Sequence, residues 1–167
     1  MLVLCCLWSI LRVFVRAASG RQRFNVLGAW NAVSHAFVSV TNTTVVNTDT
    51  MCELLRKIGA LGLAGPSTVV LDNARYQRNR VVQALASELS ITLLYLPSYS
   101  PNLNLIERLW RFLKRKSIYG KHHPNFAAFK AAIEHTLSQL GTTHAHALNS
   151  LVTLNFQELD DVSLLDG

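Results

Sequence analysis

The chain has 167 residues, of which 50% are hydrophobic and 16% are charged. This length suits one globular domain, and the apolar content excludes an intrinsically disordered chain. Sixteen Lys and Arg residues against ten Asp and Glu residues give a formal net charge of +6, which favours a polyanionic partner such as nucleic acid. The three cysteines have the spacing of neither a disulfide framework nor a zinc finger, so we expect a reducing cytoplasm and thiols that are buried as small hydrophobic groups.

The first acidic residue is Asp49, and the chain opens with the apolar run of residues 1–11, "MLVLCCLWSIL". No basic residue precedes this run, which disfavours a secretory signal peptide. It is also shorter than the roughly 20 residues that cross a bilayer. The sequence therefore predicts no membrane partner.

Three short runs rich in branched and aromatic residues, 8–17, 23–33 and 35–46, predict successive antiparallel strands. The period then changes, because Met51, Leu54, Leu55 and Ile58 recur on one helical face. We expect a helix over 48–62 that Thr48 or Asp49 caps.

Further along, a strand at 67–74, a helix at 78–89 and a strand at 91–97 predict a parallel crossover. Helices at 104–118 and 125–140 follow, and the packing of the apolar tail 148–159 is left open. The predicted fold class is α/β, with a mixed sheet flanked by helices.

Two carboxylates stand out. Asp72 ends a buried strand of the parallel type, where ligands collect in open α/β sheets, although it could equally cap the next helix. Glu107 lies in the first turn of the helix after the loop "LPSYSPN", where the helix dipole also favours a carboxylate for structural reasons. Asn102 and Asn104 can fix the start of that helix.

Two carboxylates brought together repel unless a cation lies between them, and Mg²⁺ or Mn²⁺ prefers such oxygen ligands. Asp72 and Glu107 are therefore our candidate metal ligands. Basic residues follow each of them, which favours a phosphodiester substrate over a merely solvated helix face. These residues are Arg75, Arg78, Arg80, Arg108, Arg111, Lys114, Arg115, Lys116 and Lys121.

Other chemistry has less support. The "HAH" of residues 144–146 has no acidic or Cys partner at ligand spacing, so we expect a solvated loop. No glycine-rich phosphate loop, "GxSxG" elbow or Cys with a dedicated His is present, which leaves nucleotide hydrolysis and acyl transfer without support.

The segments "VVLDNARYQRNRVVQAL" and "LLYLPSYSPNLNLIERLWRFLK" resemble the catalytic domain of bacterial transposases of the insertion sequence 630 family, in the mariner-like superfamily. Thirty-four residues separate Asp72 from Glu107, the interval that this family has between its second and third catalytic acids. The resemblance implies an RNase H-like fold whose Asp, Asp and Glu hold two divalent ions for in-line attack on DNA. It makes Asp72 the second acid and Glu107 the third, with Asn73, Asn102 and Asn104 as supports or DNA contacts.

The first acid of that family has no counterpart here, because no Asp or Glu precedes position 49. We therefore expect the first strand to be missing or replaced, with "LVLCCLW" as the candidate replacement. The expected organisation is a truncated strand region at 1–20, a catalytic domain at 21–159 and a tail at 160–167.

The expected function is that of a transposase catalytic domain with DNA endonuclease and strand-transfer chemistry, truncated and impaired by itself. The alternative is a non-catalytic remnant that only binds DNA through its basic residues; a host nuclease of the RNase H type would need a complete acidic set. The resemblance implies DNA ends and target DNA as partners. The missing first strand leaves a gap that a homodimer or a complementing N-terminal chain could fill. It also implies a location in the bacterial cytoplasm with the nucleoid.

Overall fold

The fold is seen in a computed structural model, which describes residues 22–63, 65–97 and 104–153. These residues form an α/β structure, as predicted. The elements in chain order are β1 (Asn25–Trp30), β2 (Phe37–Asn42), α1 (Thr48–Gly59), β3 (Ser67–Leu71), the 3-10 turn η1 (Arg75–Arg78), α2 (Arg80–Glu88), β4 (Ile91–Tyr95), α3 (Leu105–Ser117), α4 (Phe126–Ser138) and α5 (Ala145–Leu151).

The strands form two sheets of two strands each. β1 and β2 pair in antiparallel fashion, with Asn25 opposite Asn42 and Trp30 opposite Phe37. β3 and β4 pair in parallel, which confirms the crossover predicted from the strand, helix and strand pattern. In the described residues, the antiparallel and the parallel pairs predicted for one mixed sheet thus form two separate sheets. The strand expected at 8–17 lies outside the described residues.

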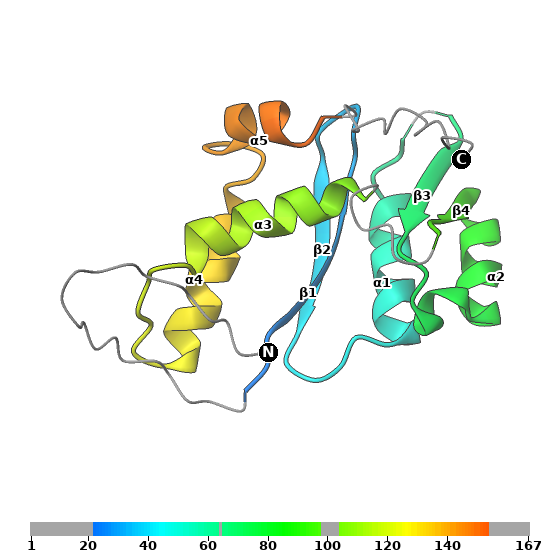
Figure 1. Cartoon of the computed structure of the whole chain (residues 1–167). Helices are drawn as coiled ribbons and strands as arrows, with labels where there is room; N and C mark the ends of the chain where they lie inside the picture. The colour runs from blue at the N-terminus through cyan, green and yellow to red at the C-terminus, as the bar shows by residue number, and fades with distance from the viewer. Residues whose placement is uncertain (1–21, 64, 98–103, 154–167) are drawn as a thin grey trace, which may run out of the picture.

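Helix α1 lies between the two sheets in Figure 1 and packs against β1 and β2. The predicted apolar face is confirmed, since Met51 and Leu55 are fully buried and Leu54 and Ile58 are nearly so. The predicted cap is wrong. Asn47 precedes the helix and accepts a hydrogen bond from the Thr50 N–H at 3.0 Å, which leaves Asp49 exposed in the first turn.

The first hydrophobic core joins α1 to β3, β4 and α2 through buried side chains that include Leu71, Val82 and Ile91. A second core lies under α3, where Leu109 and Leu148 are fully buried. Leu148 belongs to α5, so the first part of the tail 148–159 packs against α3.

Helix α3 crosses the β1–β2 sheet (Figure 1) and contacts β1. Its Trp110 ring packs edge-on against Phe37 of β2, with ring centroids 6.2 Å apart. Gly28 of β1 makes this crossing possible, because a Cβ at that position would lie 2.8 Å from ring atoms of both Phe37 and Trp110. Sheet and helix are therefore fitted closely at Gly28.

Candidate active site

Asp72 follows directly after β3 and is exposed. It does not cap a helix, because η1 begins after Ala74 and the cap of α2 is Asn79, whose side chain accepts from the Val81 N–H at 2.9 Å. The capping alternative for Asp72 is therefore wrong. The chain reverses at Asn73, whose φ of +75° is a conformation that Asn tolerates better than most residues.

Gln77 holds the loop that carries Asp72. Its side chain is buried, and its Nε2 donates to the Asp72 Oδ1 at 3.4 Å while its Oε1 accepts from the Ala74 N–H at 2.9 Å. The Gln77 carbonyl accepts from the Tyr95 hydroxyl at 3.0 Å, which ties η1 to β4. These bonds orient the Asp72 carboxylate, and no sequence signal marks Gln77 for this role.

Two tyrosines interact with Asp72 and with the turn that follows it: Tyr76 with the Asp72 charge, and Tyr95 with η1. Burial raises the pKa of the Tyr76 phenol and the negative Asp72 raises it further, while the hydrogen bond with Gln77 opposes the shift. The Arg78 guanidinium lies over the Tyr95 ring, 5.3 Å from its centroid.

Glu107 is exposed in the first turn of α3, as predicted. Asn104 caps the helix, because its Oδ1 accepts from the Ile106 N–H at 3.3 Å and its carbonyl accepts from the Glu107 N–H at 3.1 Å. Asn104 is only 7% exposed, so it acts as a structural support for Glu107. Asn102 lies outside the described residues.

Asp72, Asn104 and Glu107 all contribute to the wall of one cavity of about 880 Å³. The sequence spacing thus brings both candidate acids to a shared space. Two carboxylates are suitable oxygen ligands for a hard divalent cation. Among residues 22–63, 65–97 and 104–153, however, no three His, Cys, Asp or Glu side chains are close enough to hold a metal ion together. The donor set therefore fits a metal in part, with two acids.

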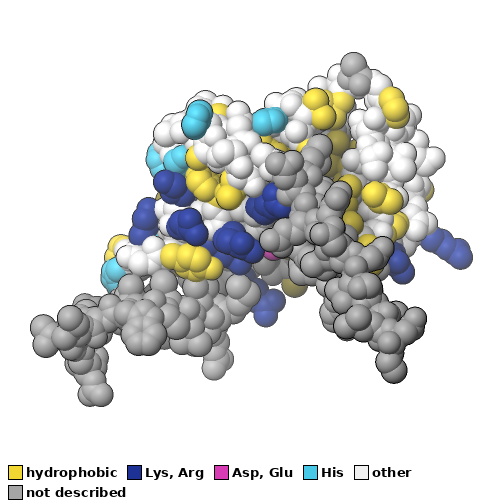
Figure 2. Space-filling model, turned by 45° about the horizontal axis from the view of Figure 1, so that its top comes forward, with side chains coloured by type: hydrophobic (Ala, Val, Ile, Leu, Met, Phe, Trp, Pro, Cys, Tyr) yellow, Lys and Arg dark blue, Asp and Glu magenta, His cyan; other side chains and the backbone are white. Residues whose placement is uncertain are grey.

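The candidate DNA-binding residues come from two parts of the fold. Arg75, Arg78 and Arg80 belong to η1 and α2, which pack against each other and against α1. Arg108, Arg111, Lys114, Arg115 and Lys116 belong to α3, which packs against β1, α4 and α5. Figure 2 shows Lys and Arg side chains gathered on one face of the molecule, with few acidic side chains visible beside them.

Within α3 the basic side chains differ in their contacts. Arg111 and Arg115 are exposed, whereas the Arg108 guanidinium donates to the Thr153 carbonyl at 3.1 Å and is partly buried. The Lys116 ammonium lies 5.7 Å from the centroid of the Phe112 ring. The Lys116 backbone carbonyl accepts a hydrogen bond from the Lys121 ammonium. Arg111 and Arg115 are therefore the α3 arginines most accessible to a ligand.

The histidines at 144 and 146 lie on an element that was predicted to be a loop. His144 precedes α5 and His146 lies within that helix. The His144 ring packs edge-on against Phe112, with centroids 5.3 Å apart, and its partial burial lowers its pKa, with the positive charges of Lys116 and His135 adding to the effect. Cys52 is buried as expected, while Cys5 and Cys6 lie outside the described residues.

Residues 12–130 match the family described as DDE superfamily endonuclease. The chain belongs to this family. No curated protein matches it. Among solved structures, a chain from the cryo-EM structure of the simian T-cell lymphotropic virus intasome in complex with PP2A regulatory subunit B56 gamma is similar, with a TM-score of 0.50 and 20% sequence identity. The similarity covers 67% of the chain described here and 41% of that chain.

This likeness confirms the RNase H-like, mixed α/β fold. As a DDE superfamily endonuclease, the chain has a nuclease-type fold with candidate acids at the end of β3 and the start of α3. Among the described residues, no helix is both long and apolar enough to span a membrane.

Proposed function

We propose that the chain is the catalytic segment of a transposase of the insertion sequence 630 type, which cuts and joins DNA phosphodiesters. The observation that carries this proposal is the shared cavity, to which Asp72 from the end of β3 and Glu107 from the start of α3 both contribute. The family match supports it, because it covers both acids. Their origin on two different elements also argues against a purely local structural role.

In this proposal, Asp72 and Glu107 hold Mg²⁺ or Mn²⁺. The bound ion supplies Lewis-acid stabilisation of charge on phosphodiester oxygens. Gln77 orients Asp72 through its amide, and Asn104 fixes the helical turn that carries Glu107. The exposed arginines of α3, with Arg75, Arg78 and Arg80, neutralise DNA phosphates, while Asn102 is a further candidate contact.

The proposal includes impaired activity of the chain by itself. Two acids without a third carboxylate bind hard cations weakly, and the described residues provide no group of three metal-ligating side chains. Full activity then requires a further carboxylate from a complementing transposase chain or a second copy. The proposed site of action is the bacterial nucleoid.

Paramagnetic relaxation by Mn²⁺ in NMR spectra tests the metal site. We expect Mn²⁺ to broaden the amide signals next to Asp72 and Glu107 together at the same concentration. Asp72→Asn should abolish the broadening at both positions, whereas the matched change Asp49→Asn in the exposed first turn of α1 should leave it intact. Broadening near only one acid, or at neither, would contradict a shared site.

The second candidate function is DNA binding without catalysis, which is favoured by the exposed arginines of α3 combined with only two candidate acids. The two functions differ in metal dependence. A DNA-binding remnant retains its full affinity for DNA without Mn²⁺, and Mn²⁺ broadens no signals at Asp72 or Glu107. A catalytic segment nicks plasmid DNA in Mn²⁺ once a complementing chain is added, and Glu107→Gln removes that activity.

A further inference from the structure

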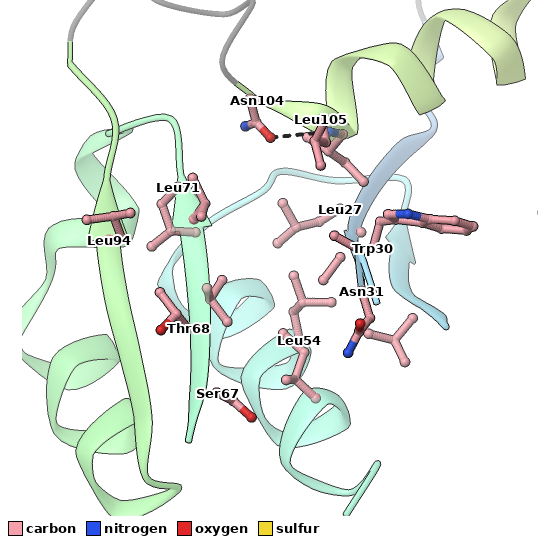
Figure 3. Close-up of a pocket in the computed structure, with 18 of the residues that line it drawn as sticks. Leu27, Trp30, Asn31, Leu54, Ser67, Thr68, Leu71, Leu94, Asn104 and Leu105 are labelled. Atoms are coloured by element: carbon pink, nitrogen blue, oxygen red, sulfur yellow. Dashed lines mark hydrogen bonds between the residues drawn. The ribbon is translucent and has the colours of Figure 1, made fainter. Parts of the chain in front are cut away.

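A second hollow lies apart from the cavity of the candidate acids. That cavity lies between β1 and β3, with Asn104 and Leu105 at one end (Figure 3). The second hollow has a volume of about 470 Å³ and lies where the chain enters β1, leaves β2 and begins α4. We call it the β1–α4 hollow, and its lining residues are Gln22, Arg23, Thr43, Thr44 and Phe126. None of these five described residues lines the first cavity.

An aromatic residue lines the β1–α4 hollow where α4 leaves the core. Phe126 is the first residue of α4, and Phe129, Lys130 and Ile133 follow it on the same helical face. Ile133 is buried, whereas the Phe126 side chain remains partly exposed. The first turn of this helical face therefore presents an aromatic side chain to the hollow and not to the core.

Neighbouring side chains hold the Phe126 ring in place. The Phe126 and Phe129 rings are stacked, with an angle of 26° between their planes and centroids 6.2 Å apart. The His123 ring packs edge-on against Phe129, with centroids 5.6 Å apart. Because a carbonyl only accepts, the His123 Nε2 donates to the Ser117 carbonyl at 2.9 Å, which ties His123 to the end of α3. The Phe126 ring is therefore positioned before any ligand arrives.

Positive charge and hydrogen-bonding groups surround this ring. Arg23 lines the β1–α4 hollow and is exposed. The Lys130 ammonium lies over the Phe24 ring, 5.6 Å from its centroid, and pairs with Glu134 at 3.5 Å. Among the described residues, no Asp or Glu lines the hollow. The remaining lining side chains supply amide and hydroxyl groups: Gln22, Thr43 and Thr44.

We propose that the β1–α4 hollow binds an unstacked nucleobase of single-stranded DNA. Proteins bind single strands by stacking bases on aromatic side chains beside positive charge that follows the backbone. Here the base stacks on Phe126, Arg23 contacts the adjacent phosphate, and the amide and hydroxyl groups bond to the edge of the base. The volume of about 470 Å³ falls within the range of about 300–1,000 Å³ of small-ligand sites. The proposal rests on the DNA partner of the proposed function, but not on the two acids or on a metal ion.

The same chemistry selects a single strand over two other ligands. Duplex DNA presents only the edges of its bases in the grooves, so its paired bases cannot stack on Phe126. A free nucleotide carries the same base and phosphate as one unit of a strand. Lys130, which lies one helical turn after Phe126, offers a second cationic contact that a longer backbone can reach and a mononucleotide cannot use at the same time.

Fluorescence anisotropy in EDTA tests the proposal with two labelled probes, an oligothymidylate and an oligonucleotide of equal length and charge whose bases are replaced by abasic sites. The full chain should bind the oligothymidylate more tightly. Phe126→Leu should weaken that binding about 5- to 100-fold and leave the affinity for the abasic probe unchanged. Arg23→Gln should weaken binding of both probes equally, because it removes a phosphate contact. The matched control Tyr119→Leu removes an exposed ring that does not line the hollow and should change neither affinity.

The unmodified chain decides the question even if Phe126→Leu does not fold. The amide NMR signals of Thr43 and Thr44 should shift with the oligothymidylate. Equal affinity for the two probes, or no shift at these two threonines, would overturn the proposal and leave the Mn²⁺ test of the acids unaffected. Thymidine monophosphate that binds as tightly as the oligothymidylate would overturn it in favour of a free nucleotide. Absence of binding to either probe would overturn both this site and the DNA partner of the proposed function.

Discussion

Replacing Gly28 by Ala places one methyl group at the tightest contact between β1 and α3. The new Cβ would lie 2.8 Å from Phe37 Cε2, Phe37 Cζ and Trp110 Cη2. Carbon atoms pack best at about 3.5–4.0 Å, so the two rings must move apart by roughly 0.7 Å or more. Both rings belong to or pack against the second hydrophobic core, where Leu109 is fully buried, which leaves them little room to move.

Overpacking of this kind costs about 1–3 kcal/mol. We expect a loss of about 2 kcal/mol in the free energy of unfolding, and a fall in Tm of roughly 6 °C for a domain of this size. Chemical denaturation followed by circular dichroism measures the first quantity and calorimetry the second.

Gly141→Ala is the matched control, because no atom lies within 4 Å of its Cβ and its φ is not in the positive range. This change should leave stability unaltered or raise it by up to about 1 kcal/mol. Equal free energies of unfolding for Gly28→Ala and the wild-type chain would refute the close fit of α3 on β1.

Three further outcomes follow from the described contacts. Asn47→Ala removes the cap of α1 and should cost about 0.5–2 kcal/mol in urea denaturation, whereas the exposed Thr43→Ala should cost less than about 0.5 kcal/mol. The lowered pKa of His144 means that the folded chain binds fewer protons than the unfolded chain, so the free energy of unfolding falls as the pH drops below about 6.5 towards the folded pKa. His144→Asn should reduce this dependence of the free energy of unfolding on pH, and a dependence unchanged from wild type would contradict the shift. The logarithm of the DNA association constant falls with the logarithm of the salt concentration, and the double variant Arg111→Ala, Arg115→Ala should make this fall less steep by about 2. Arg56→Ala, which removes an exposed arginine of α1, should leave the steepness unchanged if α3 carries the contact.

The sequence predicted an element correctly where the spacing of its apolar side chains and the residues at its ends indicate the same structure. The face of Met51, Leu54, Leu55 and Ile58 identified α1 because four apolar residues recur at helical spacing. The start of α1 was harder, since Asn47, Thr48 and Asp49 are all suitable caps and only the backbone geometry distinguishes them. Helix α5 was missed for a related reason, because a helix of seven residues has too few turns to show a period.

The positions of both candidate acids could be predicted, because each lies at the boundary of a strongly patterned element. The loop "LDNA" after an apolar strand marks Asp72, and a capping Asn followed by an amphipathic run marks Glu107. The support of Asp72 could not be predicted. Gln77 bonds to Asp72, five residues earlier, across the irregular loop, and its carbonyl accepts from Tyr95, 18 residues later. Neither bond follows from a regular pattern in the sequence.

The two candidate acids are placed by different units of the fold. Asp72 is placed by β3, which pairs with β4, whereas Glu107 is placed by α3, which packs on β1. In the described residues these two units are joined by side-chain packing over α1 and not by a strand ladder. The separation of the two carboxylates therefore depends on how α1 packs against both units.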